Sequence, residues 1–202
     1  MSILLNADES QLVLVDYQTK LMPVIHEGQQ VLANALKLAK VANMLKLPIF
    51  GTEQHPEKLG ENISEVKAYC QKTLPKTYFG ACEDGLGEWL RSPVKSQGGN
   101  ARSLPKHLQR QAESQVERNT IIVAGCEAHV CLLQTALGLI DEEFDVWVVT
   151  DACSSRTEVN RDAAFDRLAS NGAELVTTEM VIFEWIQSSD HPAFNAVLDL
   201  VK

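Results

Sequence analysis

The stretch that decides the fold is T-I-I-V-A-G-C-E-A-H-V-C-L-L-Q-T-A-L, from Thr120 to Leu137. Its first six residues form an apolar, β-branched run that ends in glycine, which is typical of a parallel strand buried on both faces. Residues 130–141 then have the apolar pattern of a helix. The stretch therefore predicts a buried strand that leads through a short turn into a helix.

Four other apolar runs predict further strands: Q-L-V-L-V-D at 11–16, P-I-F-G-T-E at 48–53, D-V-W-V-V-T-D at 145–151 and A-E-L-V-T-T at 173–178. Helical patterns occur at residues 31–45 and 159–168, and a last helix is predicted from near Pro192 to Val201. Strands that alternate with helices predict an α/β fold with a mostly parallel sheet and right-handed crossovers. Ligands of such sheets bind beyond the carboxyl ends of the strands, which points at residues 16–18, 52–54, 126–131 and 151–155.

The length and composition limit the classes of protein. A chain of 202 residues suits one domain, here taken as 1–202, and its net charge of −9 argues against a nucleic-acid partner. No apolar run reaches the ~18 residues that span a bilayer, and no export pattern opens the chain, so we expect a cytoplasmic protein without membrane attachment. The five cysteines are odd in number and show no C-x-x-C spacing, which predicts neither a disulfide framework nor a zinc site.

The segment at about 83–103 does not match the periodic patterns on either side of it. Pro93 and the Gly-Gly-Asn at 98–100 predict a loop, either on the surface or acting as a lid, inserted in the domain. A polar helical stretch follows at 104–116.

Cys131 is the better candidate nucleophile of the two cysteines in the opening stretch. It lies in the first turn of the predicted helix, where unpaired N–H groups favour a thiolate and could hold an oxyanion. Cys126 ends the strand, where a small buried residue fits. Asp16 closes the strand expected beside that of Cys131, so its carboxylate could take the thiol proton, and Lys76 could reach the same site.

The motifs around these three residues resemble those of the isochorismatase-like cysteine hydrolases. They are V-L-V-D-Y-Q, P-K-T-Y-F-G-A, V-A-G-C-E-A-H-V-C, V-V-T-D-A-C-S-S-R and E-V-N-R-D-A-A-F-D-R-L. The resemblance covers nearly the whole chain, and T-E-Q-H-P brings it nearest to the branch of isochorismatase domain-containing proteins. It implies a Rossmann-like three-layer sandwich with about six strands, and a homo-oligomer of two or more subunits.

The resemblance also implies the role of each site residue. Cys131 would be the nucleophile, Asp16 the general base and acid, and Lys76 the charge that stabilises the thiolate. The N–H groups of Glu127 and Cys131 would form the oxyanion hole, with a cis peptide bond between Cys126 and Glu127. Candidate pocket walls are Tyr17, Gln18, Gln54, Phe79 and Trp89.

One departure from the family concerns metal binding. Nicotinamidases of the family bind a metal through D-x-H, where this chain has Gln54 and Pro56 around His55. A single histidine makes a poor metal site, so we expect no catalytic metal and no cofactor. The retained Cys131 favours cleavage of an amide, ureide or related C–N bond in a small molecule.

Three alternatives stay open at this point. A vinyl-ether hydrolase of the isochorismate type would use Asp16 without the cysteine. A non-catalytic oligomeric interaction protein would keep the fold alone, and the nearly all-apolar helix after Cys131 fits such a role. Redox sensing by Cys131 would need Cys153 as the resolving thiol.

Overall fold

The computed structural model describes residues 3–91 and 118–202. Its centre is a sheet in which six strands lie in the order β3-β2-β1-β4-β5-β6, and every neighbouring pair is parallel. The strands are β1 (Ser10–Val15), β2 (Ile49–Gln54), β3 (Lys72–Lys76), β4 (Thr120–Gly125), β5 (Asp145–Val149) and β6 (Glu174–Val176). This confirms the α/β fold, and β1 pairs with β4 as the sequence predicts.

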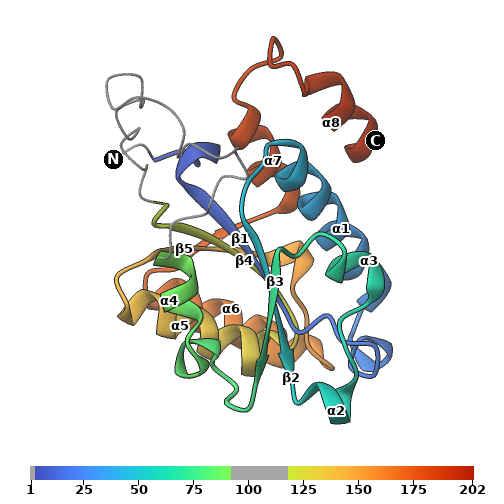
Figure 1. Cartoon of the computed structure of the whole chain (residues 1–202), viewed down its shortest axis with the longest axis vertical. Helices are drawn as coiled ribbons and strands as arrows, with labels where there is room; N and C mark the ends of the chain where they lie inside the picture. The colour runs from blue at the N-terminus through green and yellow to red at the C-terminus, as the bar shows by residue number, and fades with distance from the viewer. Residues whose placement is uncertain (1–2, 92–117) are drawn as a thin grey trace, which may run out of the picture.

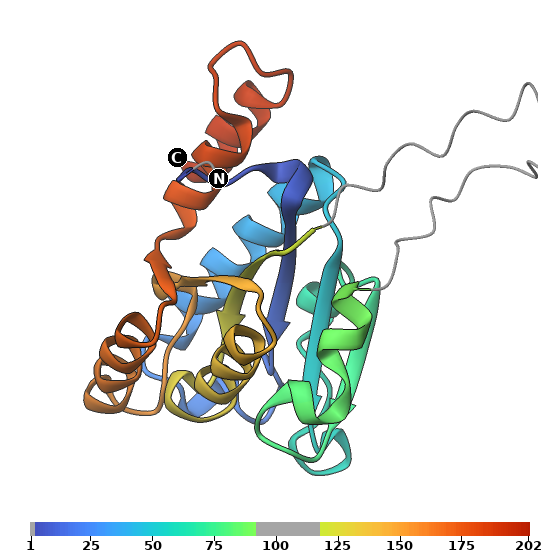
Figure 2. The same ribbon diagram turned by 90° about the vertical axis from the view of Figure 1, so that its left-hand side faces the viewer.

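Helices cover both faces of the sheet and make three layers (Figures 1 and 2). One face carries α1 (Gly28–Met44), α3 (Ser64–Lys67) and α7 (Thr178–Ile186), with α8 (Phe194–Val201) packed on α1 and α7. The other face carries α4 (Leu86–Arg91), α5 (Leu133–Asp141) and α6 (Glu158–Ser170). Short elements complete the chain: α2 (Pro56–Leu59), η1 (Ala7–Glu9), η2 (Met22–Val24), η3 (Ala81–Asp84), η5 (Ala128–Leu132) and η6 (Thr150–Ala152).

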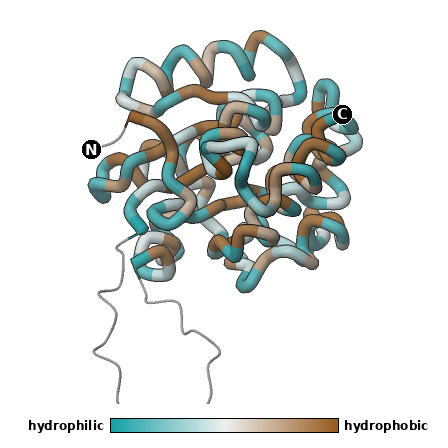
Figure 3. The backbone as a smooth tube through the Cα atoms, turned by 90° about the horizontal axis from the view of Figure 1, so that it is seen from above, coloured by the Kyte–Doolittle hydropathy of each residue, from teal (hydrophilic) through white to brown (hydrophobic). Residues whose placement is uncertain are grey.

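The hydrophobic core lies on both faces of the central strands, because helices cover both faces of the sheet. All six residues of β1 and of β2 are buried, and so are the last five of β4. Continuous apolar runs are stable there because neither face of these strands meets water. Figure 3 shows brown, hydrophobic stretches in the middle of the molecule, and alternating brown and teal along the helices around it.

Strand β3 is the element for which the prediction was incomplete. Its sequence K-T-L-P-K is short and carries a proline and two lysines, so the sequence predicts a strand or turn only after Lys76. In the structure Lys76 is the last residue of the strand. Pro75 is tolerated because β3 lies at the edge of the sheet, where a missing N–H costs no interstrand bond.

The predicted loop at 83–103 is wrong at its beginning. Helix α4 occupies Leu86–Arg91, and Gly85, at a φ of 93°, joins it to η3. Residues 92–103 and the predicted helical stretch at 104–116 lie outside the described residues. Within residues 3–91 and 118–202, no helix is long and apolar enough to cross a membrane.

Candidate active site

Four adjacent strands bring the candidate catalytic residues to one edge of the sheet. Asp16 directly follows β1, Gln54 ends β2 and Lys76 ends β3, with Gln54 and Lys76 opposite each other in register. Cys131 lies after β4, in the π-helical turn η5 that continues into α5. Since the carboxyl ends of parallel strands meet at the same edge, residues far apart in the chain become neighbours here.

Asp16 is held at the end of β1 by hydrogen bonds from its backbone and its side chain. Its backbone has a φ of 52°, a left-handed conformation that aspartate tolerates better than most residues. Its N–H donates to the carbonyl of Thr52 at 3.2 Å, and its Oδ1 accepts from the Thr52 hydroxyl at 2.7 Å. Oδ2 lies 2.8 Å from Nζ of Lys76 and has no other donor among the described residues. This oxygen is therefore the one available to receive a proton.

The side chains of Asp16 and Lys76 form an ion pair with no exposure to solvent. The ammonium also donates to Oε1 of Gln54 at 2.6 Å and to the carbonyls of Phe79 at 3.1 Å and Tyr78 at 3.4 Å. Burying two charges is expensive unless each is paired and hydrogen-bonded, as both are here. Such a pair in a fold that could use apolar residues instead marks a candidate functional site.

Cys131 reaches this pair from the other side. The residue is 7% exposed, and its Sγ lies 4.0 Å from Oε1 of Gln54. The pKa of the Cys131 thiol is raised to about 12, mainly by burial and also by the charge of Asp16, while the charge of Lys76 acts in the opposite direction. The resting group is therefore a thiol. This corrects the expectation that the helix terminus and Lys76 favour a thiolate. The loss of water around the buried sulfur raises its pKa more than these two groups lower it.

The turn after β4 carries the expected cis peptide bond between Cys126 and Glu127. Gly125 lets this turn pass close to β1, since a Cβ there would collide with the carbonyl oxygen of Val15. Cys126 is fully buried and donates its N–H to that same oxygen at 3.0 Å. The Glu127 carboxylate accepts from the N–H and Nε of Arg156 at 3.0 and 2.9 Å. Among the described residues, nothing accepts the Glu127 N–H, so it is available to an oxyanion.

Tyr17 and Gln18 do not border the hollow beside the site, and their buried side chains bond backbone groups instead. The Tyr17 hydroxyl donates to the carbonyl of Ala152 at 2.5 Å, and burial raises its pKa well above 10. The Gln18 amide bonds both the N–H and the carbonyl of Gln54, at 2.9 and 3.0 Å, and thereby fixes the end of β2.

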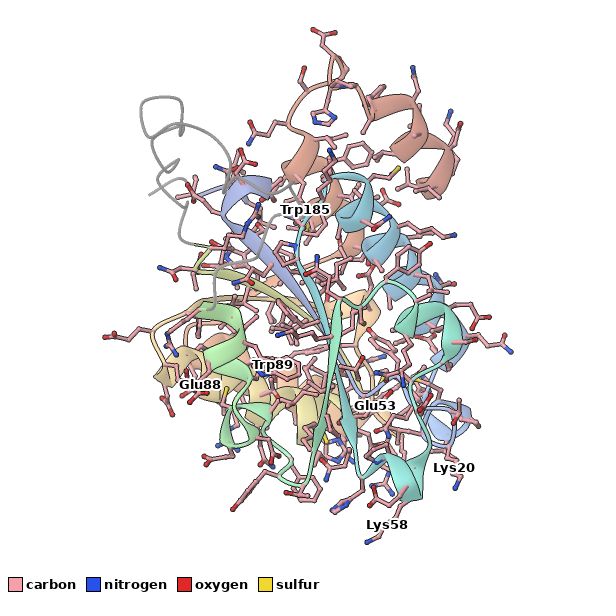
Figure 4. The ribbon with its side chains drawn as sticks, in the orientation of Figure 1. Lys20, Glu53, Lys58, Glu88, Trp89 and Trp185 are labelled. Atoms are coloured by element: carbon pink, nitrogen blue, oxygen red, sulfur yellow. The ribbon has the colours of Figure 1, made fainter. Side chains whose placement is uncertain are left out.

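Trp89 is also wrong as a pocket wall, because it lies at the opposite end of the strands. Its ring is 6.4 Å from that of Phe50 near the start of β2, and Nζ of Lys72 at the start of β3 lies 5.1 Å from it. Trp89 belongs to α4, and Figure 4 shows it on the side of this helix that faces the sheet. It packs the amino-terminal half of the sheet, whereas the candidate site lies at the carboxyl ends.

Phe79 does line a hollow next to the site. It is 52% exposed, and with its neighbours it borders a depression of about 300 Å³ whose wall is Thr77, Tyr78, Phe79, Gly80, Cys82, Glu83, Gln134 and Gly138. Lys76 directly precedes this wall in sequence. Asp16, Gln54 and Cys131 do not border the hollow, so it adjoins the site without opening onto the thiol.

The place where nicotinamidases hold a metal has a different structure here. His55 pairs with Glu57, with 2.9 Å between Nδ1 and Oε1, and Pro56 begins α2. Oε1 of Gln54 is engaged by the Lys76 ammonium. In the part of the chain that the structure describes, no group of three or more His, Cys, Asp or Glu residues could hold a metal ion.

Thr52 is the site residue that sequence reasoning covered only as part of the strand end. Its hydroxyl orients Asp16, and it lies two positions before Gln54, so both side chains point to the same face of β2. That alternation was readable in T-E-Q. His129, the histidine nearest to Cys131 in sequence, instead bonds Ser155 Oγ through Nδ1 at 2.9 Å and does not serve the thiol.

Comparisons with known proteins agree on one family. The model described as isochorismatase domain matches residues 10–180. Isochorismatase domain-containing protein 2A of Mus musculus is 32% identical over 195 residues, which are 96% of this chain and 84% of that protein. Isochorismatase domain-containing protein 2 of Homo sapiens is 32% identical over 193 residues, with 96% and 83% covered.

Two solved structures show the same similarity. The MAR1 ribonuclease from Caenorhabditis elegans superposes with a TM-score of 0.81 and 30% identity, covering 98% of this chain and 91% of that one. The YcaC gene product from Escherichia coli, described as an octameric hydrolase of unknown specificity, gives a TM-score of 0.79 and 25% identity, covering 99% and 90%.

Proposed function

We propose, from the premise that this chain belongs to the isochorismatase family, that it is a metal-independent cysteine hydrolase that cleaves a C–N bond of a small molecule. The family that the sequence motifs indicate is confirmed by the match over residues 10–180. We take the whole chain as one hydrolase domain, with Cys131, Asp16 and Lys76 as its catalytic residues and no cofactor.

The observation that carries the proposal is the fully buried Asp16–Lys76 pair beside a thiol. Its Oδ2–Nζ distance is 2.8 Å, and the charges of both residues act on Cys131. A scaffold protein would gain nothing from this pair, because buried ions rarely stabilise a fold more than apolar residues do. A hydrolase needs both a base next to the sulfur and a counter-charge that keeps the base ionised.

In the proposed mechanism Oδ2 of Asp16 takes the proton of the Cys131 thiol as the sulfur attacks the substrate carbonyl. The oxyanion that forms accepts hydrogen bonds from the N–H groups of Glu127 and Cys131. Asp16 then gives its proton to the leaving nitrogen, and the C–N bond breaks to leave a thioester on Cys131. Water, deprotonated by Asp16, hydrolyses the thioester and restores the thiol.

The charge balance of the site indicates the substrate class. Asp16 and Lys76 neutralise each other and Cys131 is an uncharged thiol, so a charged reacting group would be buried without a partner. We therefore expect a neutral amide or ureide at the reacting carbon. We also propose a cytoplasmic homo-oligomer, since the similar YcaC gene product is described as octameric.

The test is a panel of small amides, ureides, esters and vinyl ethers, given to the wild type, Cys131→Ala and Asp16→Asn. Release of ammonia or acid that disappears in both variants supports the proposal. Turnover of a vinyl ether that survives Cys131→Ala but not Asp16→Asn contradicts it and favours the ether-hydrolase alternative. No turnover of any panel compound also counts against it.

A ribonucleotide substrate belongs in the same panel. The similar structure from Caenorhabditis elegans is described as a ribonuclease, whereas the net charge of −9 on this chain opposes the binding of a phosphate backbone. We expect a short single-stranded RNA to remain intact. Its cleavage by the wild type but not by Cys131→Ala would replace the C–N substrate class with a nucleic-acid one.

A further inference from the structure

Gln54 lies between the two groups on which the proposed chemistry depends. Its Oε1 is 2.6 Å from Nζ of Lys76 and 4.0 Å from Sγ of Cys131. The residue is 5% exposed. The proposed proton transfers do not use this amide, so a buried polar side chain at this point requires another role.

The orientation of the Gln54 amide is fixed from both ends. Its Nε2 donates to the carbonyl of Thr77 at 2.8 Å, so Oε1 is the atom that faces Lys76 and Cys131. Its backbone N–H and carbonyl are both bonded by the buried amide of Gln18. Turning the amide would therefore leave buried donors and acceptors unpaired, which costs free energy for each group.

The hydrogen-bond count at Lys76 shows what this orientation achieves. An ammonium has three N–H donors. Its three shortest contacts are Oε1 of Gln54, Oδ2 of Asp16 and the carbonyl of Phe79, at 2.6, 2.8 and 3.1 Å. These acceptors compete with the sulfur of Cys131 for the Lys76 ammonium, which is near enough to the sulfur to lower its pKa. A thiolate would thus have to share the nearest cation with Gln54 and Asp16.

We propose that Gln54 is a positioning residue that competes with the Cys131 sulfur for the Lys76 ammonium, so that the thiol keeps its proton until a substrate carbonyl is in place. The inference rests on the proposed function, in which Cys131 is the attacking group. Removing the acceptor oxygen frees one N–H of Lys76 for the sulfur and stabilises the thiolate. Adding a negative charge at the same place disfavours the thiolate.

The test compares the alkylation of Cys131 by iodoacetamide at pH 8 in the wild type, Gln54→Met and Gln54→Glu, with the Cys131 peptide followed by mass spectrometry. In Gln54→Met the thiol pKa should fall by at least about 1, which makes alkylation about tenfold faster. Gln54→Glu should react no faster than the wild type. Unchanged or slower alkylation in Gln54→Met, or faster alkylation in Gln54→Glu, overturns the proposal.

Several controls isolate the electrostatic effect. Methionine and glutamate are both close to glutamine in size, so a mere change of access would move both rates in the same direction. Cys70, whose pKa is also raised to about 12 by burial, serves as the reference thiol in every sample. Gln11→Met replaces another buried glutamine, one bonded to the carbonyls of Leu90 and Arg118, and should leave the Cys131 rate unchanged.

Folding and function are kept apart in this design. Gln54→Leu, with the same expected direction, replaces Gln54→Met if that variant does not fold. The readout uses no substrate. A panel without turnover would therefore contradict the proposed function while leaving the alkylation result to decide the role of Gln54.

Discussion

Strand β2 has a cluster of charged side chains on each of its faces. The ion pair in one cluster is buried, and that between Lys67 and Glu61 in the other is exposed to solvent. Its side chains alternate, so Thr52 and Gln54 face one side and Glu53 faces the other. The inner cluster on the first side is Asp16, Lys76, Gln54 and Cys131. The outer cluster on the second side is Glu53, Lys67 and Glu61, and Figure 4 shows Glu53 on the side of α2 and α3, away from Trp89.

The two clusters contain ion pairs of similar length. Nζ to carboxylate distances are 2.8 Å for Lys76–Asp16 and 2.9 Å for Lys67–Glu61. The first pair has no side-chain exposure, whereas Lys67 is 36% and Glu61 is 70% exposed. An exposed pair is solvated whether or not it forms, but a buried pair depends wholly on its partner. Contact distance alone therefore does not distinguish the pair proposed to be catalytic from the other pair, whereas burial does.

The largest expected effect is on turnover by the inner carboxylate. Asp16→Asn should lower kcat/KM by about 10²–10⁴-fold, because the amide cannot take the thiol proton. Asparagine also tolerates the left-handed backbone at this position, so the turn is kept. The measurement is the steady-state rate with the best panel substrate.

Glu61→Gln is the matched control, since it removes a carboxylate from the outer cluster. Its rate should stay within about twofold of the wild type. Equal losses in Asp16→Asn and Glu61→Gln would remove the functional distinction between the clusters. Thermal unfolding is followed in parallel, because Lys76 loses its counter-charge in Asp16→Asn.

The next effect is on stability when a lysine is replaced. Lys76→Met should lower the free energy of unfolding by about 3–5 kcal/mol, because Asp16 is left buried and unpaired. The double variant Asp16→Asn with Lys76→Met should regain most of this loss, since it removes both charges. Urea denaturation measures all three proteins, and a double variant as unstable as Lys76→Met would contradict the account.

The pH dependence of stability tests the neutral thiol of the inner cluster. An unfolded cysteine loses its proton above about pH 8.5, whereas the pKa of folded Cys131 is raised to about 12. The folded protein thus holds one proton more in this window, and its stability should fall as the pH rises. Cys131→Ala should flatten the loss by about 1.4 kcal/mol per pH unit between about pH 9.5 and 11. Equal slopes would mean that folded Cys131 is already a thiolate.

The smallest effect belongs to the outer lysine. Lys67→Met should lower the free energy of unfolding by only about 1 kcal/mol, because its pair with Glu61 is exposed. The buried Glu53, which lies 3.4 Å from Lys67, still accepts the N–H of Asn62 at 2.8 Å. Salt at about 1 M should shrink this difference further. A loss as large as that of Lys76→Met would show that burial does not separate the two clusters.

Much of the fold was readable in the sequence because buried parallel strands have a strong signature. The runs at 11–16, 48–53, 120–125, 145–151 and 173–178 correspond to β1, β2, β4, β5 and β6. The helices at 31–45 and 159–168 correspond to α1 and α6. β3 escaped because an edge strand exposes one side and needs no continuous apolar run.

The candidate site was only partly readable, because spacing along the chain gives the ends of strands but not the direction of side chains. The spacing predicted that Asp16, Lys76 and Cys131 lie at one edge of the sheet, and the structure places them there. The spacing could not show that Gln18 points back to clamp Gln54, or that Trp89 packs at the other end of β2. Nor could it weigh burial against the helix terminus at Cys131, since burial depends on the complete packing.

The measurement that tests the central claim most directly is the mass of the Cys131 peptide after an acid quench of the wild type during turnover of its best substrate. The account predicts an added acyl group on Cys131, kept in Cys126→Ala, whereas Cys131→Ala shows neither the adduct nor turnover. An acyl group on another residue, or undiminished turnover by Cys131→Ala, would contradict it.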